Sequence, residues 1–240
     1  MQVRNEIEKI TSFLQKEMGG KTPVLAISGG IDSALVLMLL KEAFPDRNVR
    51  AFFMPDAFTP KADYRDVEAL GKVSGVNIET LKIEPVISSF STLLGVNSKE
   101  ALGNIKSRTR MVILFYQANV NNGMVVGTTN RSEYTVGYYT KYGDGACDIE
   151  PIMHLLKRDV RELASALNVP KSIINKRPSA GLWESQTDES ELGMTYEELD
   201  KIIVTLFDSK QEAVDPMQQR VMSLYSGSEH KRRMPVSMND

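Results

Sequence analysis

Residues 24–40 read VLAISGGIDSALVLMLL, and this stretch decides the fold. Its apolar run is interrupted by Ser28, Gly29 and Gly30 and resumes at Ile31. A buried strand that passes through glycines into a helix is typical of open α/β sheets, which bind ligands beyond the carboxyl ends of their strands. Backbone N–H groups and the helix dipole favour an anion at that point. We therefore expect a phosphate-binding loop, although the acid Asp32 stands where a phosphate should lie.

The composition is that of a globular protein with a full core. The chain has 240 residues, of which 42% are hydrophobic and 25% charged. The net charge of -2 does not favour nucleic acid or an anionic membrane as a partner. The single cysteine, Cys147, excludes an internal disulfide and a multi-cysteine zinc site. The first ten residues are charged and lack an apolar signal region, so we expect a cytoplasmic protein.

Apolar periodicity predicts strands that alternate with helices, the pattern of a parallel sheet with helices on both faces. We expect strands at residues 23–27, 49–54, 76–83 and 124–129, and a weak fifth strand at 148–152. Helices are expected at residues 4–18, 31–44, 60–75, 85–94, 99–119, 157–167, 195–207 and 215–226. No repeat or linker divides the chain, so residues 1–240 are predicted to form a single domain with a Rossmann-like α/β fold.

A long polar segment, residues 176–194, lies between two of the expected helices. A long structureless loop inside a compact domain is often a functional lid. We expect residues 178–193 to cover a ligand, with Trp183 facing it, and name these residues the lid segment.

Asp32 would repel a phosphate unless a cation lay between them. Mg²⁺ is typically held by one or two carboxylates together with substrate oxygens, so a shared magnesium ion resolves the conflict. In the alternative, Asp32 merely stabilises the first turn of its helix, as acids do. The loop matches neither the G-x-x-x-x-G-K-[ST] pattern nor G-x-G-x-x-G.

At this point the sequence resembles a known family. SGGIDS (28–33) is similar to the pyrophosphate-binding loop of the N-type ATP pyrophosphatases, which cleave ATP between the α and β phosphates. Further motifs resemble, in order and spacing, those of ammonia-dependent NAD synthetase: GNIKSRTR (103–110), GTTNRSEYTVGYYTKYGDGACDIEPI (127–152), RPSAGLWESQTDESELG (177–193) and EHKRRMP (229–235). The resemblance covers residues 24 to 235 and implies an adenine nucleotide alpha hydrolase-like fold.

The resemblance implies a ligase that amidates deamido-NAD with ammonia, using ATP and Mg²⁺ and forming an adenylate of the nicotinate carboxylate. It implies Asp32 and Glu133 as magnesium ligands. It places Lys157 on the ATP phosphates, where the lysine would stabilise charge as pyrophosphate leaves. Without the motif, Glu133 reads as a solvent-facing acid and Lys157 as a surface lysine. The residues implied to bind ATP are Ala26, Ile27, Ser28, Gly29, Gly30, Ile31, Asp32, Ser33, Thr128, Lys157 and Ser179.

The remaining motif residues are implied to serve the second substrate and ammonia. Asp144 would lie beside the entering ammonia as a second catalytic residue. Many members have an acid where Gly181 stands and Thr where Ser179 stands, so contacts in that loop differ in detail. Taken alone, a loop charge cluster or a basic tail is usually solvated. The residues implied to bind deamido-NAD are Arg108, Lys141, Asp148, His230 and Lys231.

The segment MVILFY (111–116) predicts a homodimer. Consecutive positions point all round a helix, so this stretch needs cover on more than one side. A two-fold partner is an economical cover, and Arg108, one turn earlier, would then bring the substrate to the subunit boundary. The alternative is a helix buried within the monomer.

Two other functions stay open from the sequence. One is a different pyrophosphatase, such as a tRNA-modifying enzyme, for which more than one cysteine or a basic surface is expected. The other is a non-catalytic nucleotide-binding module, which would not need carboxylates poised for a metal. Glutamine use requires a further domain with its own nucleophile, and Cys147 lies inside a synthetase motif. We therefore expect the chain to use ammonia, which a separate glutaminase could supply.

Overall fold

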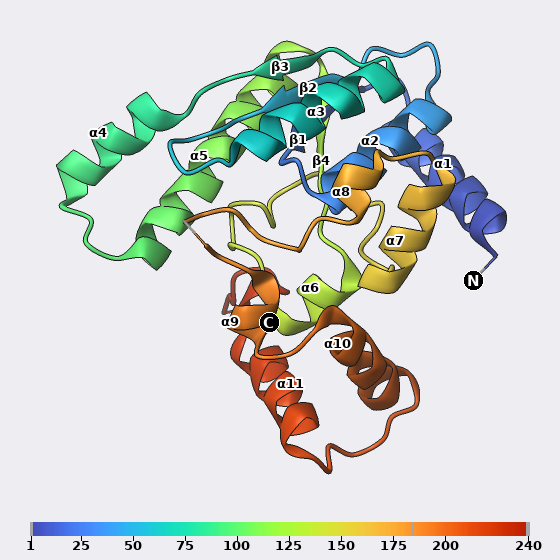
Figure 1. Cartoon of the computed structure of the whole chain (residues 1–240), viewed down its shortest axis with the longest axis vertical. Helices are drawn as coiled ribbons and strands as arrows, with labels where there is room; N and C mark the ends of the chain where they lie inside the picture. The colour runs from blue at the N-terminus through green and yellow to red at the C-terminus, as the bar shows by residue number, and fades with distance from the viewer. Residues whose placement is uncertain (1, 184, 239–240) are drawn as a thin grey trace.

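A four-stranded parallel sheet, in the order β3-β2-β1-β4, forms the centre of the protein (Figure 1). In its register, Val24 of β1 lies opposite Arg50 of β2 and Val125 of β4. The computed structural model describes residues 2–183 and 185–238. The strands are β1 Thr22–Ile27, β2 Arg50–Phe53, β3 Ile78–Thr80 and β4 Gly123–Val126.

Helices cover both faces of this sheet, which confirms the predicted fold class. One face carries α1, α2, α3, α7 and α8, and the other carries α4 and α5. None of the helices among the described residues is long and apolar enough to cross a membrane. The helices are α1 Val3–Met18, α2 Ile31–Ala43, α3 Lys61–Ser74, α4 Glu84–Leu94, α5 Lys99–Val120, α6 Arg131–Val136, α7 Lys157–Ala166, α8 Lys171–Ile174, α9 Asp188–Leu192, α10 Tyr196–Ile203 and α11 Pro216–Gly227.

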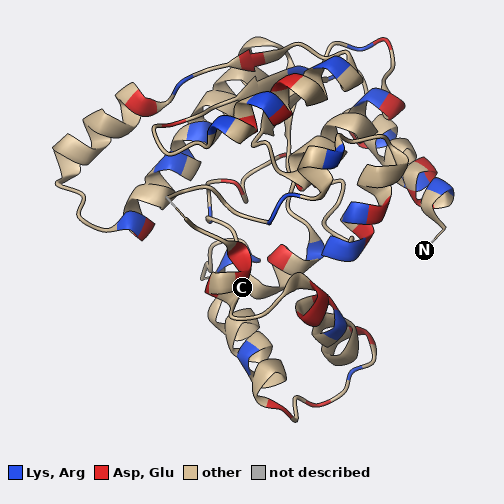
Figure 2. Cartoon of the chain, viewed as in Figure 1, with Lys and Arg blue, Asp and Glu red and all other residues tan. Residues whose placement is uncertain are grey.

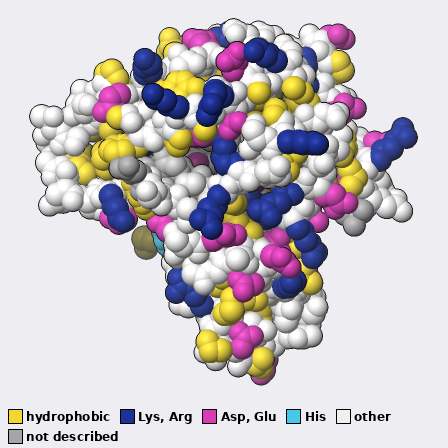
Figure 3. All heavy atoms as spheres, in the orientation of Figure 1, with side chains coloured by type: hydrophobic (Ala, Val, Ile, Leu, Met, Phe, Trp, Pro, Cys, Tyr) yellow, Lys and Arg dark blue, Asp and Glu magenta, His cyan; other side chains and the backbone are white. Residues whose placement is uncertain are grey.

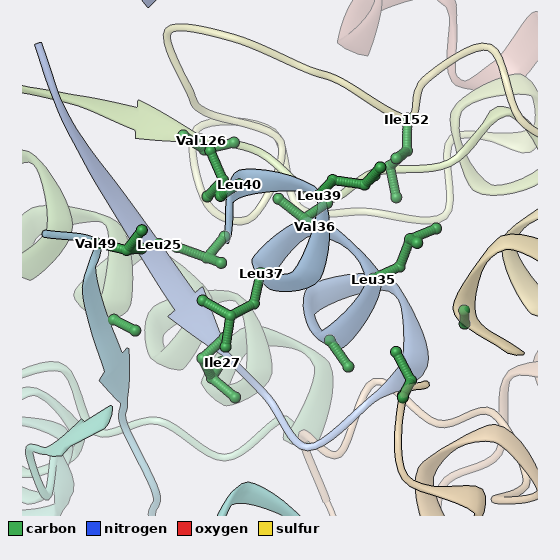
Figure 4. Packing of buried hydrophobic residues seen from close by; sticks show 14 of the residues in the cluster. Leu25, Ile27, Leu35, Val36, Leu37, Leu39, Leu40, Val49, Val126 and Ile152 are labelled. Atoms are coloured by element: carbon green, nitrogen blue, oxygen red, sulfur yellow. The ribbon is translucent and has the colours of Figure 1, made fainter. Parts of the chain in front are cut away.

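The core explains why the opening stretch is apolar nearly throughout. Side chains alternate along β1, so that Leu25 and Ile27 face one helical layer and Val24 faces the other. Helix α2 is buried on almost every side, as expected for a helix that is hydrophobic all round. Figure 4 shows Leu37 of α2 pointing toward Ile27 of β1. This packing fixes where β1 ends and α2 begins.

The predicted fifth strand at residues 148–152 does not form, which corrects the sequence prediction. Only a single parallel bridge, between Val126 and Ile149, continues the sheet there. The Asp148 carboxylate accepts the backbone N–H of Val125 at 2.7 Å, and Asp148 donates its own N–H to the Val125 carbonyl at 2.9 Å. Pro151 has no N–H to offer a ladder, so the pairing stops after one residue.

Two short helices lie where the sequence was read as loop. Helix α6 begins with a capping box, in which the Asn130 side chain accepts the Glu133 N–H at 3.0 Å. Helix α9 begins at Asp188 inside the lid segment and ends at Gly193, whose φ of 75° suits glycine. Residue 184 of the lid segment lies outside the described residues.

The C-terminal helices α10 and α11 form a separate lobe below the sheet in Figure 1. A one-turn π-helix, Val204–Asp208, follows α10. The lobe packs on α6 through its own apolar cluster, which includes Val136, Tyr196 and Val221. It therefore supports the short helix that carries Glu133.

Replacing Leu37 by alanine tests the packing of α2. Leu37 is fully buried between α2 and the sheet, so Leu37→Ala should lower the free energy of unfolding by about 2–5 kcal/mol. Urea denaturation measures this change. Val214→Ala, at a position that is 79% exposed, is the control and should shift stability by less than about 0.5 kcal/mol. Equal small effects at both positions would contradict this packing.

Candidate active site

A cavity of about 930 Å³ opens beyond the carboxyl ends of the strands. Figure 3 shows Lys and Arg side chains gathered near the middle of one face, where the surface is hollowed. All eleven residues that the resemblance implied for ATP line this cavity, and so do Glu133, Asp144 and Lys231. The structure thus brings these residues together at one edge of the sheet.

The expected phosphate-binding loop, residues 28–33, is held by hydrogen bonds between its own residues and by a bond from Lys176. The Ser33 hydroxyl accepts the Ser28 N–H at 3.2 Å and donates to the Gly30 carbonyl at 3.1 Å. Gly29 has a φ of 82°, and a Cβ there would lie 3.1 Å from the Cβ of Asp63. Lys176, which the sequence analysis missed, donates to the Gly29 carbonyl at 2.8 Å and pairs with Asp63 at 2.9 Å. A side-chain residue at position 29 is therefore strained and crowded.

Lys157 joins the two predicted metal ligands. Its ammonium lies 2.6 Å from Asp32 Oδ2 and 2.9 Å from Glu133 Oε1, and its side chain is 3% exposed. The ring of Tyr196 lies 4.8 Å away, and the Asn130 amide donates to Asp32 Oδ1 at 2.8 Å. The structure thus brings together side chains from α2, α6 and α7. The reading of Lys157 as an ordinary surface lysine is wrong.

In this cluster one ammonium faces two carboxyl groups. Burial raises the pKa of Glu133 to about 8; the Lys157 charge opposes this shift and the Asp32 charge adds to it. Burial opposes the charge on Lys157, but the two carboxylates outweigh burial and raise its pKa above the usual value. Lys157 therefore stays charged, and Glu133 holds a proton more readily than an exposed carboxyl group unless a further cation favours its ionised form.

Helix α6 is fixed at its carboxyl end by Arg232, which follows the short 3-10 helix Glu229–Lys231. The Arg232 guanidinium donates to the carbonyls of Tyr134 and Thr135, at 3.3 and 3.1 Å, and to the Ser228 hydroxyl at 2.7 Å. Arginine suits the last carbonyls of a helix because they carry partial negative charge. The C-terminal segment thereby sets the position of Glu133.

Three of the residues implied for deamido-NAD, Arg108, Lys141 and His230, contact one another, whereas Asp148 bonds to Val125 of β4. Arg108 donates to the Lys141 carbonyl at 3.3 Å, and the Lys141 ammonium donates to the His230 carbonyl. Lys231 donates to the carbonyls of Gly137 and Tyr139 at 2.7 and 2.6 Å. Of the described residues in this group, Lys231 lines the cavity, whereas Arg108, Lys141, Asp148 and His230 do not.

Asp144 is held in place at the cavity wall. Its Oδ1 accepts the Ser107 hydroxyl at 2.5 Å and the Thr140 N–H at 3.0 Å. Both bonds end on the same oxygen, so the Asp144 carboxylate is oriented by Ser107 of α5 and by the backbone at Thr140.

The residues that the sequence analysis missed include two acids and a lysine. Asp188, 4% exposed, lines the cavity and accepts the Tyr196 hydroxyl at 3.0 Å. Asp56 and Lys106 form a fully buried ion pair at 2.9 Å. Lys106 and Asp188 could have been found from the sequence, since they lie inside the family motifs at residues 103–110 and 177–193. Asp56 lies in none of these motifs.

The donor set fits magnesium. Among residues 2–183 and 185–238, no three acidic, His or Cys side chains converge as ligands for a metal. Two carboxylates, Asp32 and Glu133, share one ammonium within the cavity. Mg²⁺ usually takes one or two carboxylates and completes its shell with waters and phosphate oxygens, so two are enough when a nucleotide supplies the rest.

A parallel sheet that ends in a glycine loop, with a buried lysine and two carboxylates beside it, defines a nucleotide-binding α/β enzyme. The family model described as NAD synthase matches residues 3–235. The chain belongs to the NAD synthase family.

Individual relatives agree with this assignment. The NH(3)-dependent NAD(+) synthetase of Picrophilus torridus is 54% identical over 96% of this chain and 93% of its own length. A structure of NMN synthetase from Francisella tularensis is 32% identical, with a TM-score of 0.91 over all of both chains. An NH3-dependent NAD synthetase structure from Campylobacter jejuni is 28% identical, with a TM-score of 0.85 over 99% of this chain and 100% of that one.

Burial of Glu150 makes stability depend on pH. Its carboxylate accepts the Thr129 N–H at 3.2 Å, and a Cβ on Gly127 would lie 2.3 Å from the carboxyl group. Burial raises the pKa of Glu150 from 4.5 to about 7, so the folded protein binds this proton more tightly than the unfolded chain does. The stabilisation is complete below pH 4.5 and is lost as the pH rises to about 7.

Glu150→Gln removes this titration. As the pH rises from 4.5 to 8, the parent protein should lose about 1–3 kcal/mol of stability that the variant keeps, because the glutamine amide never acquires a charge. Urea denaturation of both proteins at several pH values measures the difference. A stability difference that does not change with pH would contradict the prediction.

Proposed function

We propose that this chain, an ATP-dependent ligase of the NAD synthase family that converts deamido-NAD and ammonia to NAD, AMP and pyrophosphate, carries out both half-reactions in the cavity. The observation that carries the proposal is the meeting of the phosphate loop with Lys157, Asp32 and Glu133 at one edge of the sheet.

In the first half-reaction, the nicotinate carboxylate attacks the α-phosphorus of ATP and pyrophosphate leaves. Residues 28–33 hold the phosphates with backbone N–H groups, serine hydroxyls and the N-terminus of α2. Lys157 stabilises the negative charge that develops on the leaving group. Its burial strengthens this effect, because water does not screen the ammonium.

Asp32 and Glu133 would hold Mg²⁺ against the ATP phosphates. When bound, the ion supplies positive charge that lets carboxylates and phosphates lie together and polarises the phosphoryl oxygens. The support is the meeting of two carboxyl groups beside the phosphate-binding loop, where a divalent cation would favour the ionised form of both. Asn130 keeps Asp32 oriented in either state through its bond to Oδ1.

In the second half-reaction, ammonia attacks the acyl carbon and AMP leaves. Asp144 orients the ammonia with the oxygen that Ser107 and Thr140 leave free. The lid segment excludes water that would hydrolyse the adenylate. Burial raises the pKa of the Cys147 thiol, so it lacks the activation that glutamine hydrolysis would require. The ammonia comes from solution or from a separate glutaminase, and the setting is cytoplasmic.

A homodimer completes the binding of deamido-NAD in this proposal. Val112 and Tyr116 on α5 are 71% and 61% exposed, while Met111 and Leu114 pack inward. The neighbouring helix α4 adds exposed Phe90 and Leu93, giving an apolar surface that a second copy would cover. Arg108, one turn before Val112, then stands at the subunit boundary beside Lys141 and His230. Asp148 and Lys231 complete the group of residues assigned to this substrate.

The direct experiment is incubation of the purified chain with ATP, Mg²⁺, ammonium and deamido-NAD. NAD and AMP should form in equal amounts, and glutamine should not replace ammonium. Nicotinate mononucleotide is the parallel substrate, because one similar structure is that of an NMN synthetase. Amidation of the mononucleotide alone would contradict the assigned substrate.

Asp32→Asn tests the metal site. Turnover should fall by at least about 100-fold, because the variant loses a charge that acts on the phosphates, while the fold should persist. Calorimetry should show that Mg²⁺ no longer strengthens ATP binding, and Glu133→Gln should act in the same direction. Asp46→Asn, at an exposed loop acid, is the control. Near-normal activity of Asp32→Asn at saturating Mg²⁺ would exclude the assigned site.

Val112→Glu tests the dimer. A charge on the exposed apolar face of α5 should separate the subunits. It should also lower the affinity for deamido-NAD, because Arg108 would no longer lie at a contact between two subunits. Size-exclusion chromatography with light scattering measures the mass. Val73→Glu, on exposed α3, is the matched control. A fully active monomeric parent protein would rule out the shared site.

A further inference from the structure

Four residues of α5 lie on the side of the helix that faces the cavity and the segments around it. Gly103, Lys106, Ser107 and Arg110 are spaced i, i+3, i+4 and i+7, which places them on the same side of the helix. Ser107 donates to Asp144, and Arg110 donates to the Met54 carbonyl at 3.0 Å. Ser107 and Arg110 line the cavity, and Lys106 lies between them and the lid segment on the same side of the helix.

Lys106 is 1% exposed and its ammonium has three partners from two distant segments. It lies 2.9 Å from Asp56 Oδ2, donates to the Leu182 carbonyl at 2.8 Å, and sits 4.4 Å from the centre of the Phe58 ring. An ammonium has three N–H donors, so a carboxylate, a carbonyl and an aromatic face use its full capacity. Its position is therefore determined on all sides.

The lid segment lies directly against the same helix. A Cβ on Gly103 would lie 3.2 Å from the Leu182 side chain and 3.3 Å from the Trp183 ring, so a larger residue there would push these side chains outward by a few tenths of an ångström. Lys99, one turn earlier, lies 5.2 Å from the Trp183 ring centre. Leu182 and Trp183 both line the cavity. Contact with α5 thus sets the position of this part of the lid.

The other partner of Lys106 shapes the opposite wall. Asp56 Oδ1 accepts the Phe58 N–H at 2.9 Å and the Thr59 hydroxyl at 3.2 Å, closing the turn that follows β2. Phe58, Thr59 and Pro60 line the cavity. Lys106 is the link between this wall and the lid segment.

We propose that Lys106 is a positioning residue that fastens the lid segment at Leu182 to the Asp56 turn and so keeps water from the adenylate. This rests on the proposed function, in which an adenylate forms in the cavity. If the lid is loose, water instead of ammonia attacks the acyl carbon, the bond to the AMP oxygen breaks, and deamido-NAD and AMP are released. The net result is hydrolysis of ATP to AMP and pyrophosphate without NAD.

The sole tryptophan of the chain, Trp183, reports the lid position without any added label. Lys106→Met should raise the acrylamide quenching constant of Trp183 fluorescence at least about twofold, because the contact that seats the neighbouring Leu182 is lost. The same variant should release roughly two or more AMP per NAD, against one in the parent protein. Lys72→Met, at an exposed lysine on α3, is the matched control.

Two more variants separate lid positioning from charge burial. Lys106→Met with Asp56→Asn removes both charges of the buried pair, while the bond to Leu182 stays absent. Arg110, which also lies 3.7 Å from Asp56, keeps its bond to the Met54 carbonyl in this variant. Gly103→Ala keeps Lys106 but pushes against Leu182, and alanine does not weaken the helix. Both should reproduce the quenching and the excess AMP.

Normal quenching and one AMP per NAD in the double variant would show that Lys106 only balances Asp56, and would overturn the proposal. Increased quenching with unchanged AMP per NAD would overturn the role in excluding water. A parent protein that forms no NAD at all would refute the proposed function instead, and the fluorescence measurements would still locate the lid segment.

Discussion

The structure of the site depends on one buried ammonium shared by two carboxylates. Lys157, at the start of α7, touches Asp32 at the start of α2 and Glu133 in the first turn of α6. A lysine at a helix N-terminus is opposed by the helix dipole, so only nearby negative charge makes this placement stable. The contacts fix three helix starts at one point, and the cavity forms around them. Figure 2 shows how acidic and basic residues are spread along the remaining helices.

Local patterns made much of this architecture predictable. The apolar run on both sides of Ser28–Gly30 predicted β1, α2 and the loop between them, because a strand covered on both faces and a buried helix need nearly continuous apolar sequence. The fifth strand failed for local reasons, Pro151 and the Asp148 side chain. Helix α6 was missed although its signal, Asn130 followed by Glu133 three residues later, stands in the sequence.

Contacts between distant segments could not be predicted in the same way. Lys157 and Asp32 are 125 positions apart, and spacing contains no information on such a pair. The resemblance to a family placed both in one site but did not show that they touch. Lys106 is harder still, since a lysine in a helix usually faces water and its burial follows from Asp56 and Leu182, which belong to other segments.

The contact of Arg232 with α6 has a consequence for the whole chain. Tyr134 and Thr135, which receive that guanidinium, directly follow Glu133, and Lys231 holds the adjoining loop at Gly137 and Tyr139. The turn at Glu229–Lys231 and Arg232 thus supports the candidate active site, although it follows the phosphate-binding loop by about two hundred positions. A change in the segment that carries Lys231 and Arg232 would therefore alter the position of the Glu133 carboxylate, although neither residue touches it.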